Sequence, residues 1–126
     1  MTSNDSVIQV QGLQKSFGTK HVLREVSFCL TKGTTLALLG RNGAGKTTII
    51  RTLMGLLLKD AGTVRIAGLD PQADSLEVRR RVGFLAEDQQ MFGWMSVDQM
   101  IRFIAAFYPA WDHRLAAQLV QQYGLD

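Results

Sequence analysis

The stretch that decides the fold is Gly40-Arg41-Asn42-Gly43-Ala44-Gly45-Lys46-Thr47, which fits the pattern G-x-x-x-x-G-K-[ST]. From average glycine usage, a chance match is expected in fewer than about one in a hundred chains of this length. The glycines let the backbone curl so that successive N–H groups point inward and form a nest for an anion. The sequence therefore predicts a phosphate-binding loop at residues 40–47.

The residues on either side of this loop supply the strand and the helix that such a loop requires. Residues 34–39 form an apolar run, typical of a strand buried on both faces of a parallel sheet. Residues 47–58 repeat apolar side chains at helical spacing, and the start of that helix adds its positive dipole to the loop. The order strand, loop, helix predicts an α/β fold with a P-loop nucleoside triphosphatase core.

The segments before and after this unit predict further short elements. Alternating apolar residues indicate an antiparallel pair of strands over 7–13 and 21–30, and a third strand over 63–68. Residues 75–81 read as a short helix and residues 82–85 as a short apolar strand. The only cysteine, Cys29, has apolar neighbours and is expected to be a small core residue.

The last thirty or so residues are predicted to be all-helical. Ser96 and Gln99 form a capping box, while Asp112 caps a second helix that ends at Gly124. Two short helices cannot bury their apolar residues between themselves, so the chain is expected to be an incomplete domain. We divide it into a P-loop core with an N-terminal antiparallel β-subdomain, residues 1–95, and the beginning of a helical subdomain, residues 96–126.

The composition is that of an ordinary globular protein, with 46% hydrophobic residues and a net charge of +3. The one basic run, residues 79–81, is interpreted as a solvated helix end, because a nucleic-acid footprint needs many such residues in a cluster. No signal peptide and no apolar run of about 18 residues is present, so a membrane role has to come through a partner.

The loop motif assigns chemistry to individual side chains. Lys46 is expected to reach the β- and γ-phosphates of ATP, Thr47 to donate its hydroxyl to Mg²⁺, and Thr48 to contact the α-phosphate. The remaining cofactor-binding residues contribute backbone groups; they are Gly40, Asn42, Gly43, Ala44 and Gly45.

The sequence Gly-Arg-Asn-Gly-Ala-Gly-Lys-Thr-Thr, preceded by residues 36–39 and followed by residues 53–56, resembles the Walker A region of ATP-binding-cassette (ABC) ATPases. The resemblance covers nearly the whole chain. It implies the ATP-binding subunit of an ABC transporter, which binds Mg-ATP and, in the complete protein, hydrolyses it to drive transport. It also implies a homo- or heterodimer of ATP-binding subunits, docked on transmembrane permease subunits at the inner, cytoplasmic face of the membrane.

Two further residues match positions of that family. Phe17 occupies the place of an aromatic residue that stacks on adenine, the alternative being a core residue at a strand end. Glu87 occupies the place where the family commonly carries a glutamine that contacts Mg²⁺ and the attacking water. A carboxylate can also bind Mg²⁺, so Glu87 is a candidate catalytic and metal-binding residue beside Lys46, with a solvated loop acid as the alternative.

The resemblance also suggests where a membrane partner docks and in which direction transport runs. Phe92, Trp94 and Met95 are candidates for the docking surface, although packing beneath the helical pair is an equal alternative. The Glu-Asp-Gln form of residues 87–89 resembles export-type members, which favours export.

Three elements of the family do not occur in this sequence: the Leu-Ser-Gly-Gly-Gln signature, the Walker B strand ending in Asp-Glu, and the switch histidine. The 126 residues alone are therefore expected to hydrolyse ATP hardly at all, because no positioned base orients the water. Two alternatives stay open. One is a non-transport ABC protein acting on ribosomes or DNA, and the other is a stand-alone nucleotide-binding module without catalysis.

Overall fold

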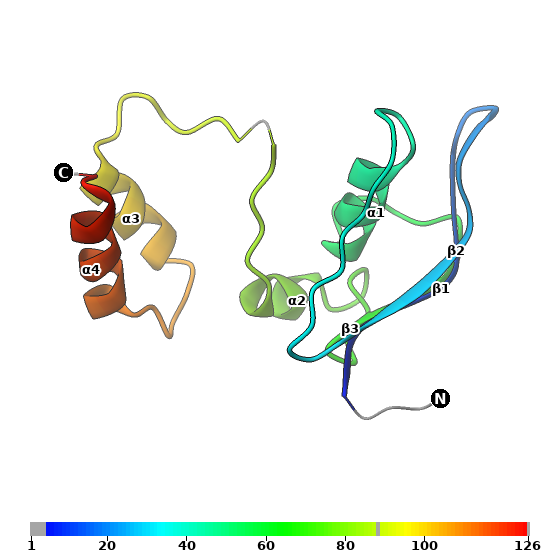
Figure 1. Ribbon diagram of the computed structural model, residues 1–126, viewed down its shortest axis with the longest axis horizontal. Helices are drawn as coiled ribbons and strands as arrows, with labels where there is room; N and C mark the ends of the chain where they lie inside the picture. The colour runs from blue at the N-terminus through cyan, green and yellow to red at the C-terminus, as the bar shows by residue number, and fades with distance from the viewer. Residues whose placement is uncertain (1–4, 88, 126) are drawn as a thin grey trace. The chain divides into compact units, whose positions relative to one another are not determined.

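The computed structural model describes residues 5–87 and 89–125, which fall into two compact units (Figure 1). The first unit extends to Gly83 and contains β1 (Ser6–Phe17), β2 (Lys20–Thr31), α1 (Lys46–Leu53), β3 (Ala61–Ile66) and α2 (Ser75–Arg81). The second begins at Phe84 and contains α3 (Val97–Ala105) and α4 (His113–Tyr123). The division at residue 95 that the sequence suggests stays a prediction about the complete domain.

The strands of the first unit form one antiparallel sheet in the order β2-β1-β3. The pair predicted near the N-terminus is confirmed as the β1–β2 hairpin, and the third predicted strand is added on the other side of β1. Val10 at the middle of β1 pairs with Phe28 of β2 and with Val64 of β3. The central strand also supplies two core residues, Val10 and Leu13, which are 2% and 0% exposed.

Two helices complete the core of this unit. Ile49 of α1 and Val78 of α2 belong to the same buried cluster as the strand residues, and Val78 is fully buried. The other buried members of the cluster are Val10, Leu13, Leu23, Val64 and Ile66. Packing of α1 against the sheet fixes the loop that precedes it, because that loop leads directly into the first turn of the helix.

Three expectations from the sequence are wrong. Residues 34–39 and 82–85 are not strands, since a parallel strand exists only through hydrogen bonds to neighbouring strands, and none of the described residues pairs with them. Cys29 is exposed rather than part of the core. Its neighbours Phe28 and Leu30 are half-buried, and side chains alternate between the faces of a strand, so Cys29 points to the other face.

The second unit confirms the predicted helix boundaries. Ser96 Oγ accepts a hydrogen bond from Gln99 N–H at 3.2 Å, and Gln99 Oε1 accepts one from Ser96 N–H at 2.9 Å. Asp112 caps α4 by accepting from Leu115 N–H at 2.9 Å, and Gly124 ends it in the left-handed conformation. Neither described helix has a fully buried residue. Local capping bonds thus define where the two helices begin and end, while their packing against each other buries no residue of either helix completely.

Within residues 5–87 and 89–125, no helix combines the length and the apolar composition that crossing a bilayer requires.

Candidate nucleotide-binding site

The predicted phosphate loop is a tight, glycine-dependent turn between the core-packed residue Leu38 and helix α1. Gly43 and Gly45 have φ values of 84° and 96°, which residues with a side chain rarely adopt. The Ala44 N–H donates to the Arg41 carbonyl at 3.0 Å and closes the turn. Of the glycines that the motif requires, Gly45 therefore has a backbone conformation that favours glycine, and Gly43 adds a second such position within the loop.

The Lys46 side chain is folded into this loop. Its ammonium group donates hydrogen bonds to the carbonyl of Gly40 and, at 3.2 Å, to that of Arg41. The positive charge thus lies against the backbone of the loop, at Gly40 and Arg41. A phosphate bound there would replace these exposed carbonyls as the acceptor of the lysine's hydrogen bonds.

The N-terminus of α1 is available to an acceptor. Gly45 is the N-cap residue, so no side chain caps this end, and the first turn contains no acidic residue. The first N–H groups of a helix have no partner within the helix and carry its positive dipole end. Thr47 is exposed in this turn and Thr48 is half-buried. An anion could therefore bind at the N-terminus of α1. The Thr47 hydroxyl could then contact an oxygen of that anion or a metal ion bound to it.

The hairpin holds this helix end in place. A Cβ atom added at Gly45 would lie 2.6 Å from Leu23 Cδ2 and 3.3 Å from Val22 Cγ1, so the loop backbone packs directly against β2. In Figure 1 the hairpin tip and the loop before α1 extend toward the same end of the first unit. Because Leu23 pairs with Lys15, the contact also places the end of β1 beside the loop.

Phe17, the candidate base-stacking residue, is the last residue of β1 and is 50% exposed. The Lys15 ammonium lies over its ring, 5.4 Å from the centroid. The ring is therefore not a buried core residue, which was the alternative interpretation, and it retains surface on which a flat group can stack.

Sequence reasoning missed the contacts that surround Phe17. Asp60, in the bend before β3, accepts hydrogen bonds from Lys15 Nζ at 3.0 Å and from Ser16 N–H at 2.6 Å. These two bonds, in that order of importance, lower the pKa of the Asp60 carboxyl below its ordinary value. No spacing pattern could have indicated a pair of residues 45 positions apart.

Glu87, the candidate metal ligand, is an exposed residue of the second unit. Its role beside the loop stays a prediction. Among the described residues no group of three or more His, Cys, Asp or Glu side chains could hold a metal ion.

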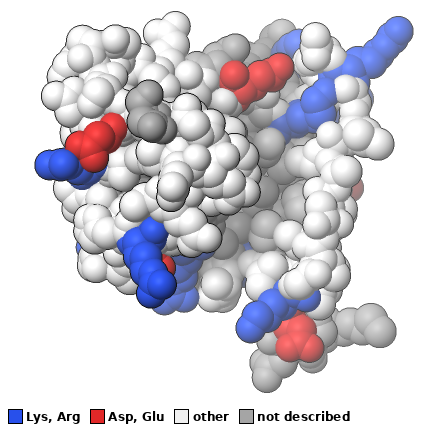
Figure 2. Space-filling model, turned by 60° about the vertical axis from the view of Figure 1, so that its left-hand side comes forward, with Lys and Arg blue, Asp and Glu red and all other residues white. Residues whose placement is uncertain are grey.

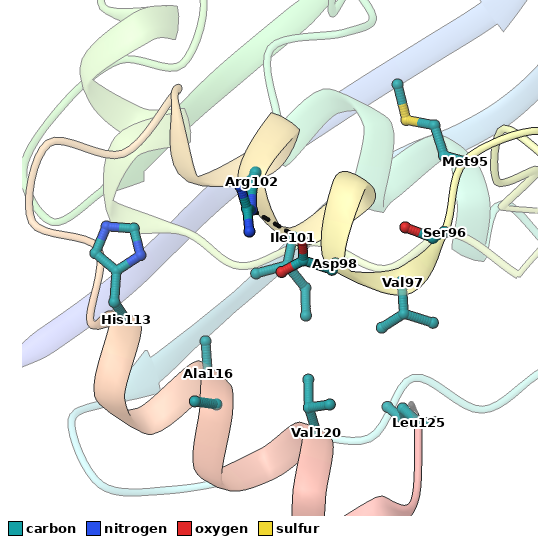
Figure 3. A pocket seen from close by; sticks show the side chains of 11 residues that line it. Met95, Ser96, Val97, Asp98, Ile101, Arg102, His113, Ala116, Val120 and Leu125 are labelled. Atoms are coloured by element: carbon teal, nitrogen blue, oxygen red, sulfur yellow. Dashed lines mark ion pairs between the residues drawn. The ribbon is translucent and has the colours of Figure 1, made fainter.

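The second unit contains an apolar groove of about 1010 Å³ between its two helices (Figure 3). Val97 and Ile101 of α3 face Ala116 and Val120 of α4, and the ion pair of Asp98 and Arg102 lies at its rim, with 2.9 Å between the bonded atoms. Both helices are amphipathic, and their apolar sides face each other across this groove without filling it.

The three candidate docking residues have different surroundings. The Phe92 ring packs edge-on against Phe103 of α3, with centroids 6.0 Å apart, which agrees with packing on the helical pair. Met95 is half-buried and lines the groove. Trp94 is 75% exposed, although its ring lies near that of Phe92. Only Trp94 offers most of its surface to a partner.

Charged side chains are dispersed on the face drawn in Figure 2, where several Lys and Arg residues stand beside Asp or Glu. The ion pairs of the first unit include Lys15 with Asp60, Arg65 with Asp70, and Arg80 with Glu77. Within the run at 79–81, Arg80 is thus paired with an acid on its own helix, consistent with a solvated helix end.

Comparisons with known proteins agree on one family. Residues 23–126 match the sequence profile of the family described as ABC transporter. The probable multidrug ABC transporter ATP-binding protein YbhF of Escherichia coli (strain K12) is 33% identical over 107 residues, which are 85% of this chain and 18% of that protein. The sulfate/thiosulfate import ATP-binding protein CysA of Bordetella pertussis is 43% identical over 97 residues, covering 76% of this chain and 27% of that protein.

A solved structure described as an ATP-binding subunit of an ABC transporter superposes with a TM-score of 0.83 at 24% identity. The match covers 94% of this chain and 51% of that one, so the chain spans about half of that structure and a smaller share of the two relatives. The likeness confirms the predicted fold: a P-loop core with a small antiparallel sheet and helices, forming part of a larger domain. The chain belongs to the ABC transporter family of ATP-binding proteins.

Proposed function

We propose that residues 40–47 bind the triphosphate of ATP. The observation that carries the proposal is the conjunction of a glycine-dependent turn, the Lys46 ammonium within it, and an uncapped helix N-terminus at Gly45. These supply, respectively, inward N–H groups, a positive charge and a dipole end, all of which favour an anion. Lys46 would contact the β- and γ-phosphates, and Thr48 the α-phosphate.

Mg²⁺ fits this site as a companion of the nucleotide. Mg²⁺ commonly binds one or two protein oxygens together with substrate phosphates, rather than a cage of protein ligands. The exposed Thr47 hydroxyl in the first turn of α1 supports such a role, and Glu87 is proposed as a further oxygen ligand. When bound, the ion would neutralise charge on the phosphates during their transfer.

We place the base of the nucleotide on Phe17. Half of this residue is exposed, and it stands at the end of a strand pair that packs against the phosphate loop. Stacking of a base on an aromatic ring contributes about 1–3 kcal/mol in nucleic-acid complexes, which is enough to separate ATP from a bare triphosphate in affinity.

In the complete protein, ATP hydrolysis would drive transport across a membrane. Lys46 and Glu87 are the catalytic residues proposed within this chain, the first stabilising phosphate charge and the second contacting Mg²⁺ and the attacking water. The proposed partners are a second ATP-binding subunit, identical or not, and transmembrane permease subunits. Trp94, with its largely exposed ring, is the residue we assign first to the permease contact. The subunit would lie in the cytoplasm, peripheral to the membrane.

Export is the direction we propose, on the basis of residues 87–89, of which residue 88 lies outside the described part. YbhF is named as a probable multidrug ABC transporter ATP-binding protein and CysA as an import ATP-binding protein, so the names of these relatives do not select a direction. Vesicles holding the complete transporter with its ATP-binding side outward would distinguish them. Substrate accumulating inside upon addition of Mg-ATP is the result expected for an exporter, and substrate leaving the vesicles would refute export.

The phosphate-loop proposal is tested by calorimetry with Mg-ATP. Replacing Lys46 with alanine should reduce binding by about tenfold to a hundredfold or more, because each hydrogen bond to a charged group is worth about 1.5–3 kcal/mol. Lys32→Ala is the matched control, because Lys32 is also a lysine and its side chain is exposed. Its hydrogen bond to Asp5 comes from the backbone N–H and is kept in the variant. Equal affinities of the Lys46→Ala and Lys32→Ala variants would refute the assignment.

Phe17 is tested by comparing two ligands. Phe17→Ala should weaken ATP binding by roughly tenfold, corresponding to ~1.4 kcal/mol of lost stacking, and leave tripolyphosphate binding nearly unchanged. Equal losses for the two ligands would show that the residue supports the fold rather than the base.

A further inference from the structure

Asp60 is bonded to three consecutive residues at the end of β1. Its backbone N–H donates to the Gln14 carbonyl at 3.0 Å. Its carboxylate accepts from Ser16 N–H at 2.6 Å and from Lys15 Nζ at 3.0 Å. The bend before β3 therefore anchors β1 close to where the ladder between the two strands ends, at the pairing of Gln14 with Ala61.

Two of these bonds act on the neighbours of Phe17. Ser16 is the residue directly before Phe17, so its bonded N–H fixes the backbone that leads to the ring. Lys15 carries the ammonium group that lies over the ring, 5.4 Å from its centroid, and only 13% of the Lys15 side chain is exposed. The Phe17 ring is thus restrained by the backbone at Ser16 and by the ammonium group of Lys15. The Asp60 carboxylate accepts a hydrogen bond from each of these two groups.

The same corner contacts the phosphate loop. Lys15 pairs with Leu23, and Leu23 is the side chain against which Gly45 packs. Phe17 follows two residues later, toward the hairpin tip. A ring that is held at this corner does not have to be ordered when a nucleotide binds, and avoiding that ordering raises affinity.

We propose that Asp60 is a positioning residue for the base of the nucleotide, acting through Lys15 and Ser16 on the ring of Phe17. The inference rests on the proposed role of Phe17 in ATP binding and adds a residue to which neither the motif nor the family resemblance assigned a role. It follows that Asp60 strengthens binding of a nucleoside triphosphate without touching it. Binding of inorganic tripolyphosphate, which has no base, does not depend on Asp60.

The test is calorimetry of Mg-ATP and Mg-tripolyphosphate binding to the 126-residue chain. Asp60→Ala should weaken ATP binding by about threefold to tenfold, the cost of ordering one side chain, and leave tripolyphosphate binding unchanged. Asp60→Asn, which keeps an acceptor for Ser16 N–H, should recover part of the loss. Glu77→Ala is the matched control, because it removes an exposed acid from an ion pair with Arg80 elsewhere in the same unit.

Repeating Asp60→Ala in a Phe17→Ala background separates positioning from a general structural effect. With the ring absent, Asp60→Ala should have no further effect on ATP binding. An effect of equal size in both backgrounds, or equal losses for ATP and tripolyphosphate, would overturn the inference. If Phe17→Ala leaves ATP and tripolyphosphate binding alike unchanged, the proposed base site itself fails and the inference with it.

A second variant carries the test if Asp60→Ala does not fold. Lys15→Met removes the cation over the ring and keeps the Asp60 bond to Ser16 N–H. It should produce the same selective loss of ATP affinity, smaller than that of Phe17→Ala. No loss, or a loss shared with tripolyphosphate, contradicts the positioning role.

Discussion

Replacing Gly45 with alanine should lower the free energy of unfolding of the first unit by about 2–5 kcal/mol. The backbone term comes from the φ of 96°, which costs a residue with a Cβ about 1–2 kcal/mol. The steric term comes from the added Cβ, 2.6 Å from Leu23 Cδ2, where carbon atoms prefer about 3.5–4.0 Å. Leu23 is 3% exposed and has little room to move, so overpacking adds about 1–3 kcal/mol.

Gly43→Ala is the matched control for this prediction. Gly43 also has a positive φ, 84°, but an added Cβ there would meet no atom within 4 Å. It should therefore show the backbone term alone. Urea unfolding followed by circular dichroism measures both variants, while the fluorescence of Trp94 and Trp111 reports the second unit separately. If Gly45→Ala destabilises no more than Gly43→Ala, the contact with Leu23 does not constrain the loop.

Two further predictions concern single polar side chains. Ser96→Ala removes the acceptor of the Gln99 N–H and should cost about 0.5–2 kcal/mol of stability in the second unit, read from tryptophan fluorescence during urea unfolding; an unchanged midpoint would mean that the capping box contributes nothing. The second is a pH dependence: Lys15 and Ser16 N–H hold the pKa of Asp60 below 3.8, so its folded-state bonds contribute fully above that pH and are lost as pH falls through the lower folded-state value. Asp60→Asn should accordingly flatten the fall in urea midpoint below about pH 4, and an unaltered pH profile would contradict the ion pair.

Local signals explain which parts of the fold the sequence predicts. A capping box needs only residues 96–99, a phosphate loop only residues 40–47, and a hairpin only two alternating segments with a turn between them. The capping box and the hairpin are present, with boundaries within a few residues of those expected, whereas phosphate binding by residues 40–47 stays a prediction. In such segments the hydrogen bonds that define the structure join residues close in sequence, so composition and spacing carry enough information.

Long-range pairing explains why the predicted strand at residues 34–39 is absent from the described residues. The apolar run at residues 34–39 identifies a segment that suits a buried strand, but strand formation depends on partners that the run itself does not contain. Cys29 was misplaced for a different reason: apolar neighbours on both sides indicate burial only if the strand is buried on both faces, and β2 alternates. The bonds of Asp60 join segments far apart in sequence, and no local pattern marks them.

The β1–β2 hairpin links the two halves of the proposed nucleotide site. Phe17 lies at its tip, and Leu23 packs against Gly45 of the phosphate loop. Lys15 connects the two, because it pairs with Leu23 and its ammonium group lies over the ring of Phe17. Because packed interiors transmit displacement, a change at Leu23 should disturb phosphate and base binding together. Changes at Asp60 should affect the base alone, and changes at Lys46 the phosphates. A loss of both phosphate and base binding at Leu23, beside selective losses at Asp60 and Lys46, is the pattern expected if one hairpin supports both halves of the site.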